Sequence, residues 1–380
     1  MFSAMSASSP HDETNPARTD PRLGAPLRIG SLELRSRVIP APMCNVSDRA
    51  FRGLNRAAGA HLVTTQMVSC EGLVRHDRKT WDLLDIGGEE PPVAVQLLGS
   101  DPGTLARAAR ILVEQGAALV DLNMGCPARK VTGNACGSAL MKEPPLVAEI
   151  VRAVRAAIDV PFTVKMRAGW DGRDISAIEL ARVCEAEGAD AVCLHARTRE
   201  QGYRGSADWS LITAMKRALR VPVIGNGDVT SPAHAVRMFR ETGCDAIMIG
   251  RGLIGNPWLF RACERAMADF LAGRITHEDE VPDDDMVLVD DDGAAAPIRV
   301  PYYMRDVTLN ERLNLLLEHT RLTIEGKGER RGVLEMRKHS QHYIRGLRGC
   351  KLLREKLMRI ETYDDIVRLL DEYRAYLAAG

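Results

Sequence analysis

The segment from Asp121 to Lys130 contains the residues of this chain that are best suited to do chemistry. Its sequence is DLNMGCPARK, and it continues the apolar residues Leu119 and Val120 in a pattern typical of the end of a buried strand. A cysteine with only a packing role belongs inside such a run. Cys126 instead stands after the run, between a glycine and a proline. We therefore expect the Cys126 thiol to have a chemical role at the exit of a strand.

Polar and ionisable residues also stand at the ends of seven other short apolar runs. In chain order, the eight run ends contain Pro42, Met43 and Cys44; Gln66; Gln96; Asn123 with Cys126; Lys165 with Arg167; His195 with Arg197; Asn226, Gly227 and Asp228; and Gly250 with Arg251. A buried lysine without a partner is costly. Lys165 at a strand end therefore favours a functional interpretation, such as stabilising negative charge on a bound ligand.

Two glycine-containing turns indicate a phosphate site. The last two runs end in IGNGD and IGRG, where glycines allow backbone N–H groups to approach an anion. Arg251 adds a positive charge to the second turn. Because parallel barrels often bind phosphate after their last two strands, the two turns together predict a bound phosphate group.

The spacing of the eight apolar runs predicts a barrel. The runs cover residues 38–43, 62–67, 93–99, 119–125, 162–169, 191–197, 222–228 and 246–251. Helical patterns lie between most of them, such as DPGTLARAARILVEQGA and ISAIELARVCEAEGA, which stop at Gly116 and Gly188. Alternating strands and helices imply parallel pairing. Eight strands favour an α/β fold of the (β/α)8 TIM-barrel type over an open doubly wound sheet, and barrel active sites lie at the C-terminal ends of the strands.

The chain divides into four regions by composition. Residues 1–26 have no apolar core segment and predict a disordered leader, and residues 27–275 contain the catalytic barrel. Residues 276–306 are an acidic insert or linker. Within it, residues 278–292 have nine acidic residues and no basic one, and we expect a disordered excursion there. Residues 307–380 show helical patterns and predict a small C-terminal helical domain.

Positive charge is concentrated near the C-terminal end, although the formal net charge of the chain is zero. Residues 326–359 contain eleven Lys or Arg and three Glu. A block of this kind suggests a polyanionic partner. A solvated helical surface is the alternative interpretation.

Composition argues against several other classes of protein. No run of about 18 uncharged apolar residues is present, so the sequence does not predict a membrane span. The nine cysteines are dispersed without a CxxC pair, which favours a reducing cytoplasm over secretion. No Cys/His cluster has the spacing of metal ligands. We expect a cytoplasmic monomer without a bound metal.

Taken together, these motifs resemble the tRNA-dihydrouridine synthases, and the general bacterial branch of that family in particular. The resemblance rests on PAPMCNVSDRAFR, VQLLGSDP, DLNMGCPARKV, GSALM, VKMRAGW, HARTREQGYRG, IGNGD, MIGRGLIGNPWLF and the later RKH. It spans about residues 27–260 and continues into the helical end. It implies an enzyme that binds FMN in the barrel and reduces the C5=C6 bond of particular uridines in tRNA. NADPH (or NADH) would reduce the flavin first.

The resemblance also implies roles for individual residues. Cys126 matches the family's proton donor: hydride from the flavin reaches C6 of the uracil, and a thiol, mostly protonated at neutral pH, can then protonate C5. Asn123 would bind the uracil edge, and Arg129 and Lys130 the nearby phosphates. The FMN would be bound by Pro42, Met43, Cys44, Gln96, Lys165, His195, Asn226, Gly227, Asp228, Gly250 and Arg251.

The target base lies inside folded tRNA and must be splayed out into the barrel mouth. The rest of the RNA then needs a basic surface. We expect this surface on the helical domain, at Arg337, Lys338, His342 and Arg345, and on the barrel rim, at Arg197, Arg199 and Arg204.

The chain departs from the family pattern at few positions. Gln66 stands where Glu is common, Cys44 where Ala is common, and the loop after Cys126 contains TGNACG. Two other classes remain open on the residues alone. One is a flavin barrel that acts on a free pyrimidine-like metabolite, as dihydroorotate dehydrogenases do, and the other is a non-catalytic RNA-binding barrel. The first of these explains neither the basic block nor the GCPARK turn.

Overall fold

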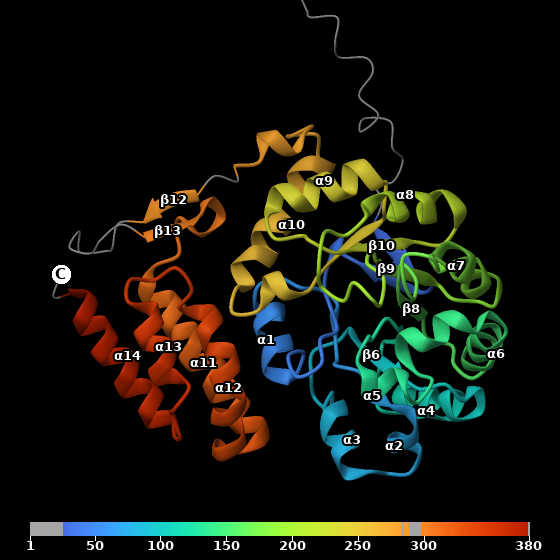
Figure 1. The fold of residues 1–380 in the computed structure, drawn as a ribbon, viewed down its shortest axis with the longest axis horizontal. Helices are drawn as coiled ribbons and strands as arrows, with labels where there is room; N and C mark the ends of the chain where they lie inside the picture. Colours follow the sequence, from blue (N-terminus) through green and yellow to red (C-terminus); the bar gives the residue numbers. More distant parts are fainter. Residues whose placement is uncertain (1–25, 283–284, 289–297, 379–380) are drawn as a thin grey trace, which may run out of the picture.

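A barrel of parallel strands forms the body of the molecule (Figure 1). The structure is a computed structural model that describes residues 26–282, 285–288 and 298–378. The barrel strands are β3 (Val38–Pro40), β4 (Val63–Thr64), β6 (Val93–Leu98), β7 (Leu119–Met124), β8 (Phe162–Arg167), β9 (Ala191–His195), β10 (Val223–Asn226) and β11 (Ala246–Ile249). Their order is β3-β11-β10-β9-β8-β7-β6-β4, and every pair along this path is parallel. Each predicted run contains a strand, and the (β/α)8 TIM barrel is confirmed.

Helices connect the strands and cover the outside of the barrel (Figure 1). They are α1 (Arg49–Ala57), α2 (Cys70–Val74), α3 (Arg78–Leu84), α4 (Pro102–Glu114), α5 (Arg129–Thr132), α6 (Pro144–Arg155), α7 (Ala177–Ala186), α8 (Trp209–Ala218), α9 (Pro232–Thr242) and α10 (Pro257–Leu271). Local sequence explains their ends. Asp101 accepts a hydrogen bond from the N–H of Thr104 at 2.7 Å and so caps α4. The chain leaves the same helix at Gly116, whose φ of +93° suits glycine.

A short hairpin fills the N-terminal end of the barrel. β1 (Leu27–Ile29) and β2 (Leu32–Leu34) pair antiparallel. Their apolar side chains join a buried cluster with residues at the starts of barrel strands, such as Leu119, Ala191 and Ala246. A further short strand, β5 (Val68–Ser69), pairs with β6. Because the hairpin occupies one end of the barrel, the C-terminal ends of the strands are the end left for a ligand.

Four helices follow the barrel and form a unit with its own core (Figure 1). α11 (Leu309–Lys327), α12 (Glu329–Tyr343), α13 (Cys350–Leu357) and α14 (Tyr363–Ala378) bury side chains such as Leu316, Met336 and Leu370 together. α11 packs against α1 of the barrel. The helical C-terminal region predicted from the sequence is confirmed. Among all the helices of the described residues, none has the length and apolar character needed to cross a membrane.

Within the acidic residues 278–292, the structure describes regular elements at 278–280 and 285–288. The expectation of a disordered excursion is therefore wrong for these two stretches. Glu278–Glu280 form a short 3-10 helix, and the Glu278 carboxylate accepts two hydrogen bonds from Arg240, at 2.8 and 2.9 Å. β12 (Asp285–Leu288) then pairs antiparallel with β13 (Ile298–Pro301). A local charge pattern could not reveal these partners. The predicted leader falls almost wholly outside the described residues.

Candidate active site

A cavity of about 360 Å³ opens at the C-terminal ends of the barrel strands. Its lining contains Asn123, Cys126 and every residue predicted to bind the cofactor: Pro42, Met43, Cys44, Gln96, Lys165, His195, Asn226, Gly227, Asp228, Gly250 and Arg251. Met67, Arg167, Tyr203 and Thr230 line it as well. The structure therefore brings the predicted residues together, while their binding of a cofactor stays a prediction.

Lys165 is half-buried and His195 is buried in this cavity. The Lys165 Nζ lies 3.1 Å from Oδ1 of Asn226, whose Nδ2 donates to the carbonyl of Met248 at 2.7 Å. The Met248 carbonyl thus orients the Asn226 amide with its oxygen toward the lysine. Burial lowers the pKa of Lys165. Burial, helped by the charges of Lys165 and Arg167, also lowers the pKa of His195 to about 2. His195 is therefore neutral at physiological pH.

Buried hydrogen bonds connect Asp121 with the amides of the cavity. Thr163 Oγ1 donates to Asp121 Oδ1 at 2.6 Å, and Gln96 Nε2 donates to Asp121 Oδ2 at 2.8 Å. Asn123 Nδ2 in turn donates to Gln96 Oε1 at 2.7 Å. Burial raises the pKa of Asp121 to about 6. Asp121 is not among the residues predicted from the sequence, although an acid inside the apolar run LVDLNM is a signal that could have found it.

Three side chains form hydrogen bonds with the backbone of Gly125 and Cys126, which we call the thiol turn. Asn123 Oδ1 accepts hydrogen bonds from the N–H groups of Gly125 and Cys126, at 3.1 and 2.9 Å. Arg167 Nε donates to the carbonyl of Gly125 at 2.7 Å, and Ser138 Oγ donates to the carbonyl of Cys126 at 2.9 Å. The thiol is half-buried and lines the cavity. Its predicted position at a strand exit is therefore correct, and its role as an acid stays a prediction.

The two glycine turns also line the cavity. Gly227 and Asp228 have φ values of +127° and +58°, so the backbone reverses sharply after β10. A short 3-10 helix begins at Arg251, after β11. Among the described residues, the first N–H groups of this turn, at Arg251 and Gly252, have no backbone acceptor. The Arg251 guanidinium lies over the Tyr203 ring, 4.5 Å from its centroid.

Two of the predicted residues bind each other in the cavity wall. Asp228 Oδ2 accepts hydrogen bonds from Arg197 Nη2 at 2.7 Å and from the N–H of Ala207 at 2.8 Å. Arg197 is only 2% exposed, and it also donates to the carbonyls of Arg204 and Gly205. The expectation that Arg197 extends an RNA-binding surface is therefore wrong about its position. A strand-end side chain can point outward or back into the rim, and the sequence pattern does not distinguish the two.

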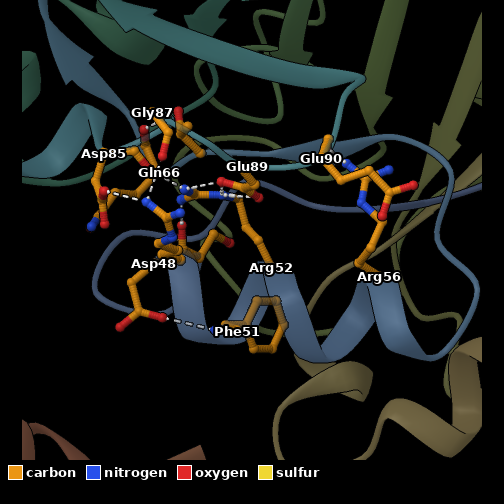
Figure 2. Close-up of polar contacts among 12 residues, drawn as sticks. Asp48, Phe51, Arg52, Arg56, Gln66, Asp85, Gly87, Glu89 and Glu90 are labelled. Carbon is orange, nitrogen blue, oxygen red and sulfur yellow. Dashed lines mark hydrogen bonds and ion pairs between the residues drawn. The ribbon is translucent and has the colours of Figure 1, made fainter. Parts of the chain in front are cut away.

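The loop after β3 forms another wall, and Figure 2 shows how α1 secures it. Arg52 is 2% exposed, and its guanidinium bonds to both carboxylate oxygens of Glu89 and to the carbonyl of Ser47. Gln66 Oε1 accepts the N–H of Asn45 at 3.0 Å. Gln66, which departs from the family pattern, therefore has a defined structural role in positioning this loop.

The helical unit contacts the same loop. Lys327 of α11 forms ion pairs with Asp48 at the start of α1 and with Glu335 of α12. The Nε2 atom of His339 lies 3.2 Å from the carbonyl oxygen of Asn45. Burial lowers the pKa of His339, so the neutral imidazole donates its Nε2–H to that carbonyl. Sequence patterns gave no indication that the helical unit reaches the cavity wall.

The predicted RNA-binding residues outside the cavity differ in exposure. The exposed members are Arg129 and Lys130 in α5, directly after the turn that contains Cys126, Arg204 on the barrel rim, and Lys338, His342 and Arg345 on the helical unit. Arg199 is half-buried. Arg337 instead donates through Nε and Nη2 to the carbonyl of Ile360, at 2.9 and 2.6 Å. Its guanidinium therefore joins α12 to the segment before α14.

The fold defines a TIM-barrel protein with a cavity at the C-terminal rim of its strands. The family model for dihydrouridine synthase matches residues 39–279. A tRNA-dihydrouridine synthase B from Pseudomonas aeruginosa is 38% identical over 338 residues, covering 89% of this chain and 92% of that protein. A probable tRNA-dihydrouridine synthase 1 from Synechocystis sp. is 38% identical over 348 residues, covering 91% and 89%. The chain belongs to the dihydrouridine synthase family, and the resemblance found in its motifs is confirmed.

A solved structure outside this family shares the barrel. The 6-hydroxypseudooxynicotine amine oxidase from Pseudomonas geniculata aligns with a TM-score of 0.51 and 15% sequence identity. The alignment covers 66% of this chain and 50% of that chain. At this identity the likeness concerns the fold alone.

Proposed function

We propose that this protein reduces the C5=C6 bond of uridines in tRNA to give 5,6-dihydrouridine, with FMN as cofactor and NADPH or NADH as reductant. The observation that carries the proposal is one cavity lined by a thiol, a half-buried lysine and two glycine turns, in a member of the dihydrouridine synthase family. The names of the two relatives include tRNA as the substrate. These names support tRNA, and not a free metabolite, as the substrate of this protein.

The residues of the cavity suit FMN. The cavity volume of about 360 Å³ lies within the range of about 300–1,000 Å³ that is typical of small-molecule sites. The N–H groups of Arg251 and Gly252, with the Arg251 guanidinium, would bind the phosphate by charge-assisted hydrogen bonds. Lys165 would face the ring system, where an ammonium group favours negative charge. Asn226 keeps that ammonium in place through its amide oxygen.

FMN, once bound and reduced by NADPH or NADH, would supply the hydride that adds to C6 of the uracil. The proton for C5 would come from Cys126: its S–H bond breaks, a C–H bond forms at C5, and the thiolate regains a proton from water. General acid catalysis of this kind contributes roughly 10²–10⁴ in rate. Because Cys126 is half-buried at the cavity lining, a base that enters from solvent can reach it.

Asn123 has one group left for the uracil. Its Oδ1 accepts two backbone N–H groups of the thiol turn, and one N–H of its Nδ2 is donated to Gln96. The second N–H faces the weak acceptor Sδ of Met67 at 3.9 Å. We infer that this N–H binds a uracil carbonyl, while the main task of the side chain is to hold the turn.

The RNA would lie across exposed basic residues on both parts of the molecule. Arg129 and Lys130 stand next to the thiol turn, and Lys338 and Arg345 stand on the helical unit. Contacts of lysine and arginine with phosphates weaken steeply as salt rises. We infer that the protein acts on tRNA as a monomer in the cytoplasm.

An anaerobic flavin assay tests the proposal. The purified protein should show a flavin spectrum, and mass spectrometry should identify the released flavin as FMN. NADPH should bleach the flavin, and unmodified tRNA added afterwards should restore its absorbance, with dihydrouridine appearing in the tRNA. A colourless protein, or a reduced flavin that tRNA does not reoxidise, would contradict the proposal.

A further inference from the structure

Asp121 is a buried acid that the proposed reaction does not use. It lies on β7 two residues before Asn123, so the two side chains point to the same side of the strand. It is 7% exposed, and both of its carboxylate oxygens accept short hydrogen bonds. Burying a carboxylate costs free energy that an apolar residue would not cost. Its presence in the barrel interior therefore calls for a role that only a hydrogen-bond acceptor can fill.

The hydrogen bonds between Asp121 and the Cys126 turn have a single direction. A carboxylate only accepts, so Gln96 must turn its NH2 toward Asp121 and its oxygen toward Asn123. Asn123 must then offer its NH2 to Gln96 and its oxygen to the backbone. At the other end, the N–H groups of Gly125 and Cys126 only donate, and they meet that oxygen at 3.1 and 2.9 Å. The Asp121 carboxylate and these backbone N–H groups therefore impose the same orientation on the amides of Gln96 and Asn123.

We propose that Asp121 is a positioning residue for Cys126, because its carboxylate orients the two amides that hold the thiol-bearing turn. The inference rests on the proposed function, in which Cys126 protonates the uracil. Asp121 touches neither the thiol nor the substrate and acts only through Gln96 and Asn123. Although burial raises the pKa of Asp121 to about 6, Thr163, Gln96 and nearby Lys165 favour its charged form. The carboxylate is therefore ionised at pH 7.5 and keeps its acceptor-only character.

Asp121→Asn tests whether the direction of the hydrogen bonds from Asn123 through Gln96 to Asp121 matters. An asparagine has the same shape, yet it can present either its oxygen or its NH2 to Gln96. The amides are then oriented only from the other end, by the N–H groups of Gly125 and Cys126. We expect Cys126 to react faster with iodoacetamide, because its turn loosens. We expect tRNA to reoxidise the reduced flavin more slowly, because the thiol is no longer held in place. Each change should be about five- to tenfold, the effect of losing one hydrogen bond.

Peptide mass spectrometry of the full-length protein, as purified, measures alkylation at each cysteine separately. Cys350 in the helical unit is half-buried and serves as the internal control, so its rate should not change. Asp190→Asn is the matched control variant, because Asp190 is a barrel carboxylate that binds Arg155 instead of the cavity amides. This variant should leave the alkylation of Cys126 unchanged.

A second substitution tests the direction itself. In Asp121→Asn combined with Gln96→Glu, the new carboxylate at position 96 accepts from the asparagine at 121 and from Asn123 Nδ2. The orientation of Asn123 is thereby imposed from both ends again. We expect the alkylation rate of Cys126 to return toward the wild-type rate. A double variant that reacts like Asp121→Asn alone would overturn the argument from direction.

Two further results would overturn the inference. One is a wild-type alkylation rate at Cys126 in Asp121→Asn. The other is a lower melting temperature with a parallel rise in Cys350 alkylation, because Asp121 would then be only structural. Alkylation of Cys126 does not depend on turnover. The proposed function and the positioning role of Asp121 can therefore be refuted independently. A wild-type protein that does not reduce tRNA refutes the proposed function, whereas an unchanged Cys126 rate in an active enzyme refutes only the role of Asp121.

Discussion

Replacing the Asp121 carboxylate by an amide should make the protein more stable at neutral and alkaline pH. Burial raises the pKa of Asp121 from 3.8 to about 6. The folded protein therefore binds this proton more tightly than the unfolded chain does. The resulting stabilisation is fully present below about pH 3.8 and is lost as the pH rises through about 6. The shift corresponds to about 3 kcal/mol, and roughly half of it is lost between pH 5 and pH 8.

Urea unfolding of wild type and Asp121→Asn at several pH values between 5 and 8 measures this loss. The difference between the two free energies of unfolding cancels the titration of the other groups. We expect this difference to shift by roughly 1–2 kcal/mol in favour of the variant from pH 5 to pH 8. Asp190→Asn, which loses an ion pair with Arg155, should show no such gain. A difference that stays constant with pH would refute the view that Asp121 is ionised at a cost to the fold.

Three other predictions concern the cavity and the RNA surface. Cys126→Ala should bind FMN and be reduced by NADPH like wild type, while tRNA reoxidises its flavin roughly 10²–10⁴ more slowly in an anaerobic assay. If Cys136→Ala shows that defect instead, the acid is the other thiol. Arg251→Ala should lose FMN more readily on dialysis, since a hydrogen bond to a charged group contributes about 1.5–3 kcal/mol; full retention would reject the phosphate assignment. Reversing the charges of Lys338 and Arg345 together should weaken tRNA binding without changing NADPH oxidation by oxygen, and equal tRNA affinity across a salt series would contradict this.

The residue types at the ends of the apolar runs predicted most of the polar residues that line the cavity. In a parallel barrel all strands point the same way, so the residues at their C-terminal ends meet at one rim whatever the exact register. This rule places Lys165, Asn226 and Cys126 in one cavity without any knowledge of their contacts. The glycine turns were also visible in the sequence, because a positive φ such as that of Gly227 favours glycine.

Only the tertiary structure decided what each of these side chains touches. Arg337 and Lys338 are neighbours in sequence, yet Arg337 binds the carbonyl of Ile360 and Lys338 is exposed. The bond between Gln96 and Asp121 joins residues 25 positions apart. Sequence periodicity describes residues a few positions apart on one element, whereas such contacts depend on the register between strands and on how helices pack. The sequence therefore determined that a thiol stands at the barrel rim, and the assembled barrel decides how its turn is held.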